Sequence, residues 1–139
     1  MKIYRIILGA YLVMMAVVVM RCEKVTEISE LVKNTEKMQI VFYADGEPVT
    51  YYDVTDKEEI RAFRKYISSD DSPMLQCPMD GRLIFFMQED VAPGSKNSIG
   101  MDFSLQGDCH IITYPYGGVM QTKKLSAAGV EYLKKKMQE

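Results

Sequence analysis

The chain places few reactive side chains close together, and the first such pair is Cys109 and His110. A cysteine beside an imidazole base could act as a nucleophile, because the thiolate is the reactive form. Both residues fall in a predicted strand, however, where neighbouring side chains point to opposite faces of the sheet. The two side chains therefore cannot share a proton, and we expect no Cys–His catalysis.

Sulfur ligands form a second candidate group at Met74, Cys77 and Met79. Soft thiolate and thioether ligands suit Cu(I). No histidine or second cysteine completes the set nearby, and methionine is also a common filler of irregular gaps in a core. The sequence therefore predicts no metal site, and it contains no motif that indicates a cofactor.

Carboxylates are the third candidate group, as Ca²⁺ ligands or as the acid–base pair of a hydrolase. They occur in three pairs: Asp70 and Asp71, Glu89 and Asp90, and Asp102 and Asp108. None has the spacing of an EF-hand loop, and a glycosidase needs two carboxylates directed at one cleft. We expect no enzyme; a small envelope hydrolase with a pocket around Asp102, Asp108 or His110 is one alternative.

Tyrosines are the most suggestive binding groups. Tyr114 and Tyr116 lie beside a predicted turn, and Tyr51 and Tyr52 lie on an early predicted strand. Exposed tyrosines favour contacts with proteins or sugars. Strand alternation directs neighbouring side chains to opposite faces, so one tyrosine of a pair can pack into the core instead. These four tyrosines form the candidate binding surface.

The N-terminus indicates where the protein resides. Lys2 and Arg5 precede an apolar run of 15 residues over 6–20. A membrane-spanning helix needs ~20 residues, whereas the apolar region of a signal peptide needs only about 7–15. We therefore expect residues 1–21 to be an export signal.

The end of this segment, Val19-Met20-Arg21-Cys22, resembles the lipobox of bacterial lipoproteins in its cysteine and in the branched residue three positions earlier. Arg21 stands where that pattern has a small residue. The resemblance implies cleavage before Cys22 and lipid on Cys22, which would tether the protein to a membrane of the cell envelope, facing the periplasm or the cell surface. The alternative is an uncleaved inner-membrane anchor with Lys2 and Arg5 in the cytoplasm.

Cleavage before Cys22 would leave 118 residues with 14 of the 17 basic residues against 19 acidic ones, a net charge of −5. Such a domain is a poor nucleic-acid binder, because phosphate binding needs a basic face. Cys77 and Cys109 remain, and exported domains form stable disulfides. Two predicted strand reversals bring these cysteines to the same end of the sheet, so we expect them to pair.

Apolar alternation and turn residues predict strands over residues 38–44, 49–54, 82–88, 99–105, 109–114 and 119–123. Asp45-Gly46 predicts a hairpin turn. The meander connections are too short for parallel crossovers. The order β-β-α-β-β-β-β-α then predicts an α+β fold with an antiparallel sheet of about six strands and helices packed on one face. Residues 38–139 are expected to form one domain after a tether or short helix over 22–37.

Two helices are expected. The first begins at a capping box, in which Asp56 accepts the Glu59 N–H and Glu59 reaches back, and buries Ile60, Phe63 and Ile67. Residues 68–73 then predict a mobile loop.

The second helix is expected to begin at Ser126 as its N-cap. Leu125 and Val130 form a hydrophobic staple across this start. Val130, Leu133 and Met137 make its apolar stripe.

The expected cellular location and the predicted small α+β fold together indicate a non-catalytic binding or accessory module of the cell envelope, whose partner is a protein or an envelope polysaccharide. This inference rests on architecture and not on a site. A small-ligand carrier with an apolar cavity is the second alternative, beside the hydrolase.

Overall fold

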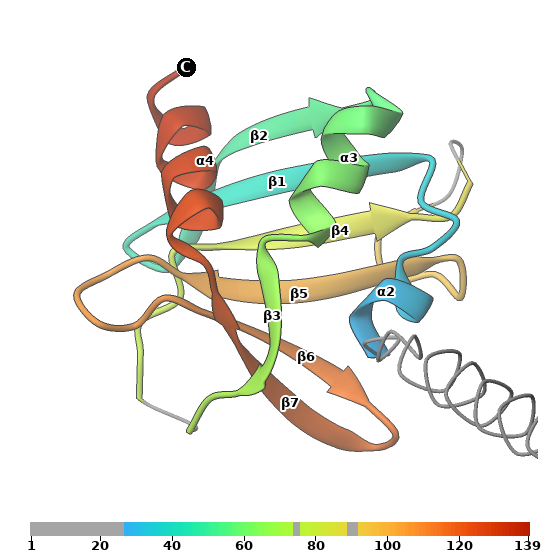
Figure 1. The fold of residues 1–139 in the computed structure, drawn as a ribbon. Coiled ribbons are helices and arrows are strands. Elements are labelled where there is room, and N and C mark those ends of the chain that lie inside the picture. Colours follow the sequence, from blue (N-terminus) through green and yellow to red (C-terminus); the bar gives the residue numbers. More distant parts are fainter. Residues whose placement is uncertain (1–26, 74–75, 89–91) are drawn as a thin grey trace, which may run out of the picture.

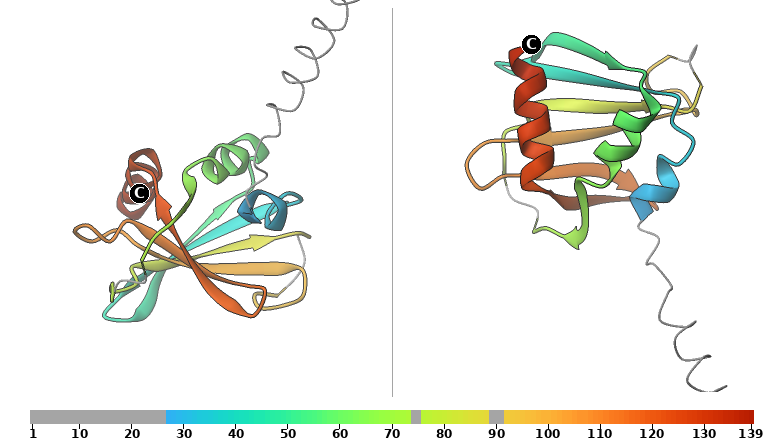
Figure 2. Two further views of the ribbon diagram at one scale, coloured as in Figure 1. Left: turned by 60° about the horizontal axis from the view of Figure 1, so that its bottom comes forward. Right: turned by 45° about the horizontal axis from the view of Figure 1, so that its top comes forward.

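The computed structural model describes residues 27–73, 76–88 and 92–139; the predicted export signal and Cys22 lie outside them. One antiparallel sheet of seven strands has the order β2-β1-β4-β5-β6-β7-β3. Figure 1 shows helices α3 and α4 on one face of this sheet, and both views of Figure 2 agree. The predicted α+β class, with a mainly antiparallel sheet and helices on one face, is confirmed. The elements are α2 (Glu27–Leu31), β1 (Lys37–Ala44), β2 (Glu47–Val54), α3 (Lys57–Arg64), β3 (Ile67–Asp71), β4 (Gly81–Phe86), β5 (Ser98–Ser104), β6 (Ile111–Tyr116), β7 (Val119–Leu125) and α4 (Ala127–Gln138).

Strand β3 was not predicted. The first helix ends at Arg64 and not at Ile67, and the expected loop over 68–73 contains this strand. Ile67 is buried as a strand residue opposite Leu125. The sequence Ile-Ser-Ser-Asp-Asp has little strand propensity of its own. The strand forms by antiparallel pairing with β7. Lys123 of β7 adds to this pairing by donating to the Asp71 carboxylate at 2.5 Å and to the Ser69 carbonyl at 3.3 Å.

The main core lies between the sheet and the helices. Phe63 of α3 contacts the rings of Phe85, Tyr66 and Tyr132, and Phe42 meets the Phe103 ring edge-on with centroids 5.8 Å apart. A smaller cluster on the opposite face consists of Val41, Ile84 and Phe86, with Tyr43 packed against it. Each fully buried side chain of this size contributes roughly 1.5–3 kcal/mol, so the helix-covered face carries most of the stability.

Both predicted helix starts are present. The Asp56 carboxylate accepts the N–H groups of Glu58 and Glu59 at 2.8 and 3.0 Å, and Ser126 Oγ accepts the Gly129 N–H at 3.2 Å. The predicted return bond of the capping box is wrong, because the Glu59 side chain instead reaches α4.

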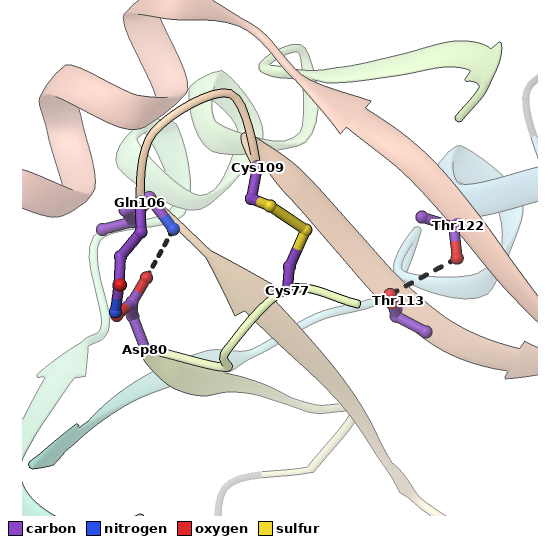
Figure 3. The surroundings of a disulfide bond; sticks show 7 residues. Cys77, Asp80, Gln106, Cys109, Thr113 and Thr122 are labelled. Atoms are coloured by element: carbon purple, nitrogen blue, oxygen red, sulfur yellow. Dashed lines mark hydrogen bonds between the residues drawn. A yellow bond between two sulfur atoms is a disulfide. The ribbon is translucent and has the colours of Figure 1, made fainter. Parts of the chain in front are cut away.

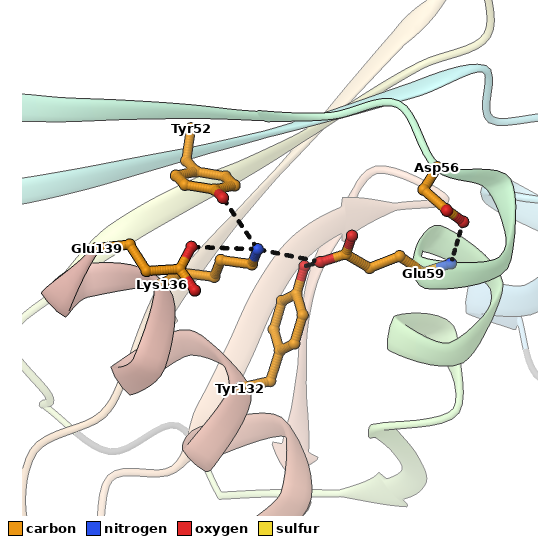
Figure 4. A network of polar contacts seen from close by, with 6 residues as sticks. All are labelled: Tyr52, Asp56, Glu59, Tyr132, Lys136 and Glu139. Carbon is orange, nitrogen blue, oxygen red and sulfur yellow. Dashed lines mark hydrogen bonds and ion pairs between the residues drawn. The ribbon is translucent and has the colours of Figure 1, made fainter.

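The predicted apolar stripe of α4 is correct at Val130 and Leu133 but wrong at Met137, which is 52% exposed. In the last turns of this helix, Tyr132 and Lys136 face β2 and α3 instead, as Figure 4 shows. The inward face of α4 therefore becomes polar toward its C-terminal end.

Candidate functional site

A disulfide joins Cys77, in the segment before β4, to Cys109, in the turn before β6 (Figure 3), with Cα atoms 5.9 Å apart. The predicted pairing is confirmed. The bond leaves Cys109 with no free thiol, which removes the nucleophile from the Cys109–His110 pair. The disulfide also removes the Cys77 thiolate as a metal ligand beside Met79. Met74, the third sulfur residue considered, lies outside the described residues.

Asp80 fixes the same region by a second means. Its carboxylate accepts the Leu105 N–H at 2.6 Å and the Gln106 Nε2–H at 2.5 Å, as the side chains in Figure 3 show. Its backbone N–H donates to the Phe103 carbonyl, and its carbonyl accepts the Tyr43 N–H, both at 2.9 Å. The turn between β5 and β6 is thus held covalently and by a charged acceptor. From the sequence, the dipeptide Asp80-Gly81 predicts only a turn and not these bonds.

The four tyrosines do not form one surface. Tyr114 is fully buried in the main core, so its place in the predicted binding surface is wrong. Tyr116 shares its face of the strand, because residues two apart point the same way, but it lies at the end of β6 beside the turn and is exposed. Tyr51 is 61% exposed and Tyr52 is half-buried. Tyr51 lies on the edge strand β2, and Tyr116 lies on β6, with β1, β4 and β5 between them.

No other strand of the described residues pairs with the outer edge of β2. β2 is an eight-residue terminal strand of the sheet, and it carries two large exposed apolar side chains, Val49 and Tyr51. The opposite terminal strand, β3, has five residues and ends in the acidic pair Asp70 and Asp71. Acidic side chains and short length discourage strand pairing. β2 has Glu47 and Pro48 at its start and Asp53 near its end, but the segment between them carries Val49 and Tyr51 and can accept another strand.

A polar cluster supports the inner face of β2 (Figure 4). Lys136 Nζ of α4 lies 3.1 Å from the Tyr52 hydroxyl and 3.3 Å from Glu59 Oε1 of α3. The ammonium also sits over the Tyr52 ring, 4.2 Å from its centroid, and the Tyr132 hydroxyl donates to Glu59 at 2.8 Å. The cluster therefore ties together the edge strand and both helices.

The pKa shifts in the cluster of Tyr52, Glu59, Tyr132 and Lys136 indicate a structural role and not that of a catalytic base. Burial and the hydrogen bond to Glu59 raise the pKa of the Tyr132 phenol far above its ordinary value. Burial lowers the pKa of Lys136, but the bonds to Tyr52 and Glu59 outweigh burial and raise it overall. At neutral pH the lysine is therefore cationic and the phenol neutral. A general base would instead need a pKa near the working pH.

The acidic candidates are not brought together. Asp102 forms a two-point ion pair with Arg82, at 2.7 and 3.2 Å, and Asp108 lies exposed in the next turn. The hydrogen bond to Asp102 raises the pKa of Arg82. Glu89 and Asp90 lie outside the described residues. Within the described ranges no three His, Cys, Asp or Glu side chains are close enough to hold a metal ion.

His110 lines a shallow, open depression of about 570 Å³ beside α4, together with Glu131, Lys134 and Lys135. Ala127 and Val130 add apolar surface to it, but its open shape differs from the enclosed cavity expected of a ligand carrier. Over the part of the chain that the structure describes, no helix is both long and apolar enough to cross a bilayer. Comparison with protein-family models, with curated proteins and with solved structures gives no match to this chain.

Proposed function

We propose that this protein is an exported, lipid-anchored module of the cell envelope that binds another envelope protein by strand addition to β2, without catalysing a reaction. The observation that carries the proposal is the outer edge of β2, an unpartnered strand edge among the described residues, with Val49 and Tyr51 exposed on it. The export and lipid anchor rest on the sequence of residues 1–22.

Strand addition uses two kinds of contact, and β2 offers both. The unpaired N–H and C=O groups of an edge strand supply affinity through main-chain hydrogen bonds, and exposed side chains supply selectivity. Val49 and Tyr51 are suited to the second role, because tyrosine is a frequent anchor residue at protein interfaces. A protein partner with an extended segment fits this edge better than a polysaccharide, which lacks a matching ladder of amide groups.

The edge is held in place before any partner arrives. β2 is paired with β1 from Glu47 to Val54, with one bulge near Tyr43, and the Lys136 cluster fixes Tyr52 from behind. A preformed edge reduces the ordering cost that binding would otherwise carry. The partner then needs only to order its own segment.

The test replaces Tyr51 with a photo-crosslinking amino acid in the full chain, expressed in a bacterial host, with the same replacement at Tyr116 as the matched control. Both are exposed tyrosines on strands, but only Tyr51 lies on the proposed edge. We expect a protease-sensitive adduct from position 51 and none from position 116, and we expect Val49→Lys to remove it. An adduct from position 116 alone, or one that only a glycan hydrolase removes, would refute strand addition to β2.

The lipid anchor is tested separately by measuring the intact mass of the protein from a membrane fraction. A chain that starts at Cys22 and carries the mass of acyl groups supports the lipoprotein proposal. A full-length chain would instead indicate the uncleaved anchor. The β2 proposal survives that second result, because either arrangement exposes the domain outside the cytoplasm.

A further inference from the structure

Four basic side chains surround a pocket between α2 and α3, at the end of the sheet where β1 begins. The pocket has a volume of about 330 Å³. Lys33 comes from the turn after α2, and three further cations come from α3: Lys57, Arg61 and Arg64. Figure 2 (right) shows α2 next to α3, and Figure 1 shows the same arrangement.

The spacing of the three α3 residues explains why they face one pocket. They stand at positions i, i+4 and i+7, which lie on one side of a helix. Arg64 Nη1 also lies 3.4 Å from the carbonyl oxygens of Val32 and Lys33. This guanidinium therefore holds the turn that carries Lys33 against α3.

The pocket is positive although the whole chain is negative. Glu36 is the single carboxylate among its described lining residues and pairs with Lys57 at 2.6 Å. Glu58 stands outside the lining and pairs with Arg61 at 2.6 Å. Among these described residues two formal positive charges remain in excess, in a chain whose net charge is −2. Exposed ion pairs such as these are weak, so a more highly charged anion can displace them.

Helix electrostatics alone do not account for this arrangement. Arg61 and Arg64 stand in the last turn of α3, where cations are favoured by the helix dipole. That reason does not extend to Lys57, at the first position of the helix, where a cation is disfavoured, nor to Lys33, on another element. The ion pair with Glu36 accounts for Lys57, which leaves the position of Lys33 to be explained.

We infer that this pocket binds a phosphate group, carried either by an anionic lipid headgroup or by a soluble phosphate ester. Guanidinium groups recognise phosphate oxygens by paired hydrogen bonds, and lysines add point charges. The volume lies at the small end of ligand pockets, which fits a headgroup and not a large cofactor. The inference does not depend on partner binding at β2.

The experiment measures how fast an amine-acetylating reagent modifies individual lysines of the full chain, read by mass spectrometry. Lys33 and Lys57 report the pocket, and the exposed Lys134 and Lys135 of α4 report the remaining surface. One arm titrates glycerol phosphate onto the chain in neutral detergent, with chloride at equal ionic strength as the reference. A second arm compares nanodiscs of neutral lipid with nanodiscs that contain phosphatidylglycerol. Arg61→Gln and the matched control Lys134→Gln each remove one exposed helix cation.

Selective protection of Lys33 and Lys57 by glycerol phosphate supports the pocket with a soluble ligand. Selective protection only in phosphatidylglycerol nanodiscs supports it with a headgroup. In either case Arg61→Gln should weaken the protection by about ten-fold or more, and Lys134→Gln should not. Absence of selective protection both by glycerol phosphate and by phosphatidylglycerol nanodiscs, or protection that Arg61→Gln leaves unchanged, would overturn the inference.

Discussion

Removing the disulfide should cost stability without unfolding the domain. Cys77 and Cys109 are 32 residues apart in the sequence. The chain-entropy model for a closed loop of that length gives about 12 cal/mol/K, or about 4 kcal/mol at 25 °C. A domain of this size loses about 4 °C of Tm per kcal/mol, so Cys77→Ser/Cys109→Ser should lower Tm by about 15 °C.

The reduced domain should stay folded because Asp80 still holds the turn between β5 and β6 through Leu105 and Gln106. Hydrogen bonds to a charged group contribute about 1.5–3 kcal/mol each, so this carboxylate is a substantial second restraint. Since both restraints act on one turn, their losses should not be additive. Asp80→Asn should therefore destabilise the double-serine variant more than it destabilises the wild type.

The assay is thermal and urea unfolding of the full chain in neutral detergent, followed by circular dichroism, with and without reductant. Reductant added to the Cys77→Ser/Cys109→Ser variant is the control, because that variant has no Cys77–Cys109 bond to lose. A Tm that reductant leaves unchanged to within about 2 °C, far below the shift expected from the loop length, would refute the reasoning. Equal effects of Asp80→Asn in the two backgrounds would refute the coupling.

Three further outcomes test the packing and the polar cluster. Gly81→Ala should destabilise by about 1–3 kcal/mol in urea unfolding, because its new Cβ would lie 2.2 Å from a β1 carbonyl oxygen, whereas the matched Gly100→Ala meets nothing nearer than 3.6 Å and should change little. Lys136 and Tyr132 have raised pKa values in the fold, so both bind protons more tightly when the domain is folded. Their contribution to the free energy of unfolding is complete below about pH 10 and is lost as the pH rises above it. Unfolding free energy measured from pH 8 to pH 11 should therefore fall above about pH 10, and less steeply in Lys136→Met. Tyr116→Ala should keep the wild-type Tm to within about 2 °C, because its side chain is exposed; a large loss would mean that this residue supports the core.

Local sequence patterns predicted the features whose conformation depends mainly on neighbouring residues. Asp45 and Gly46 have φ angles of 53° and 80°, which gives the predicted hairpin turn. Asp56 and Ser126 cap their helices because short polar side chains satisfy the first free N–H groups. The pairing of Cys77 with Cys109 followed from counting strand reversals.

Long-range contacts account for the features that local patterns missed. β3 contains Ser68 and Asp71, which alone predict a loop. It is a strand because it pairs with β7, whose Lys123, more than fifty residues later, also bonds to Asp71. The role of Asp80 depends on the distant N–H of Leu105 and could not be read from its neighbours. The helical spacing of the α3 cations was visible in the sequence, but their convergence with Lys33 required the turn after α2 to fold against the helix.

The strand register defines two opposite ends of the domain, one beside the basic pocket and one beside the disulfide. Lys37 pairs with Phe86 at the end where α2 and the basic pocket lie. Phe42 pairs with Gly81 at the other end, near the disulfide and Asp80.

Four residues separate Cys22 from α2. Even fully extended, each step spans at most ~3.6 Å, so a lipid on Cys22 would keep the basic pocket close to the bilayer surface and the disulfide end farther from it. β2 runs between the two ends for about 25 Å at ~3.3 Å per residue. A partner strand added to it would therefore extend away from the membrane, where a soluble segment of an envelope protein can reach it.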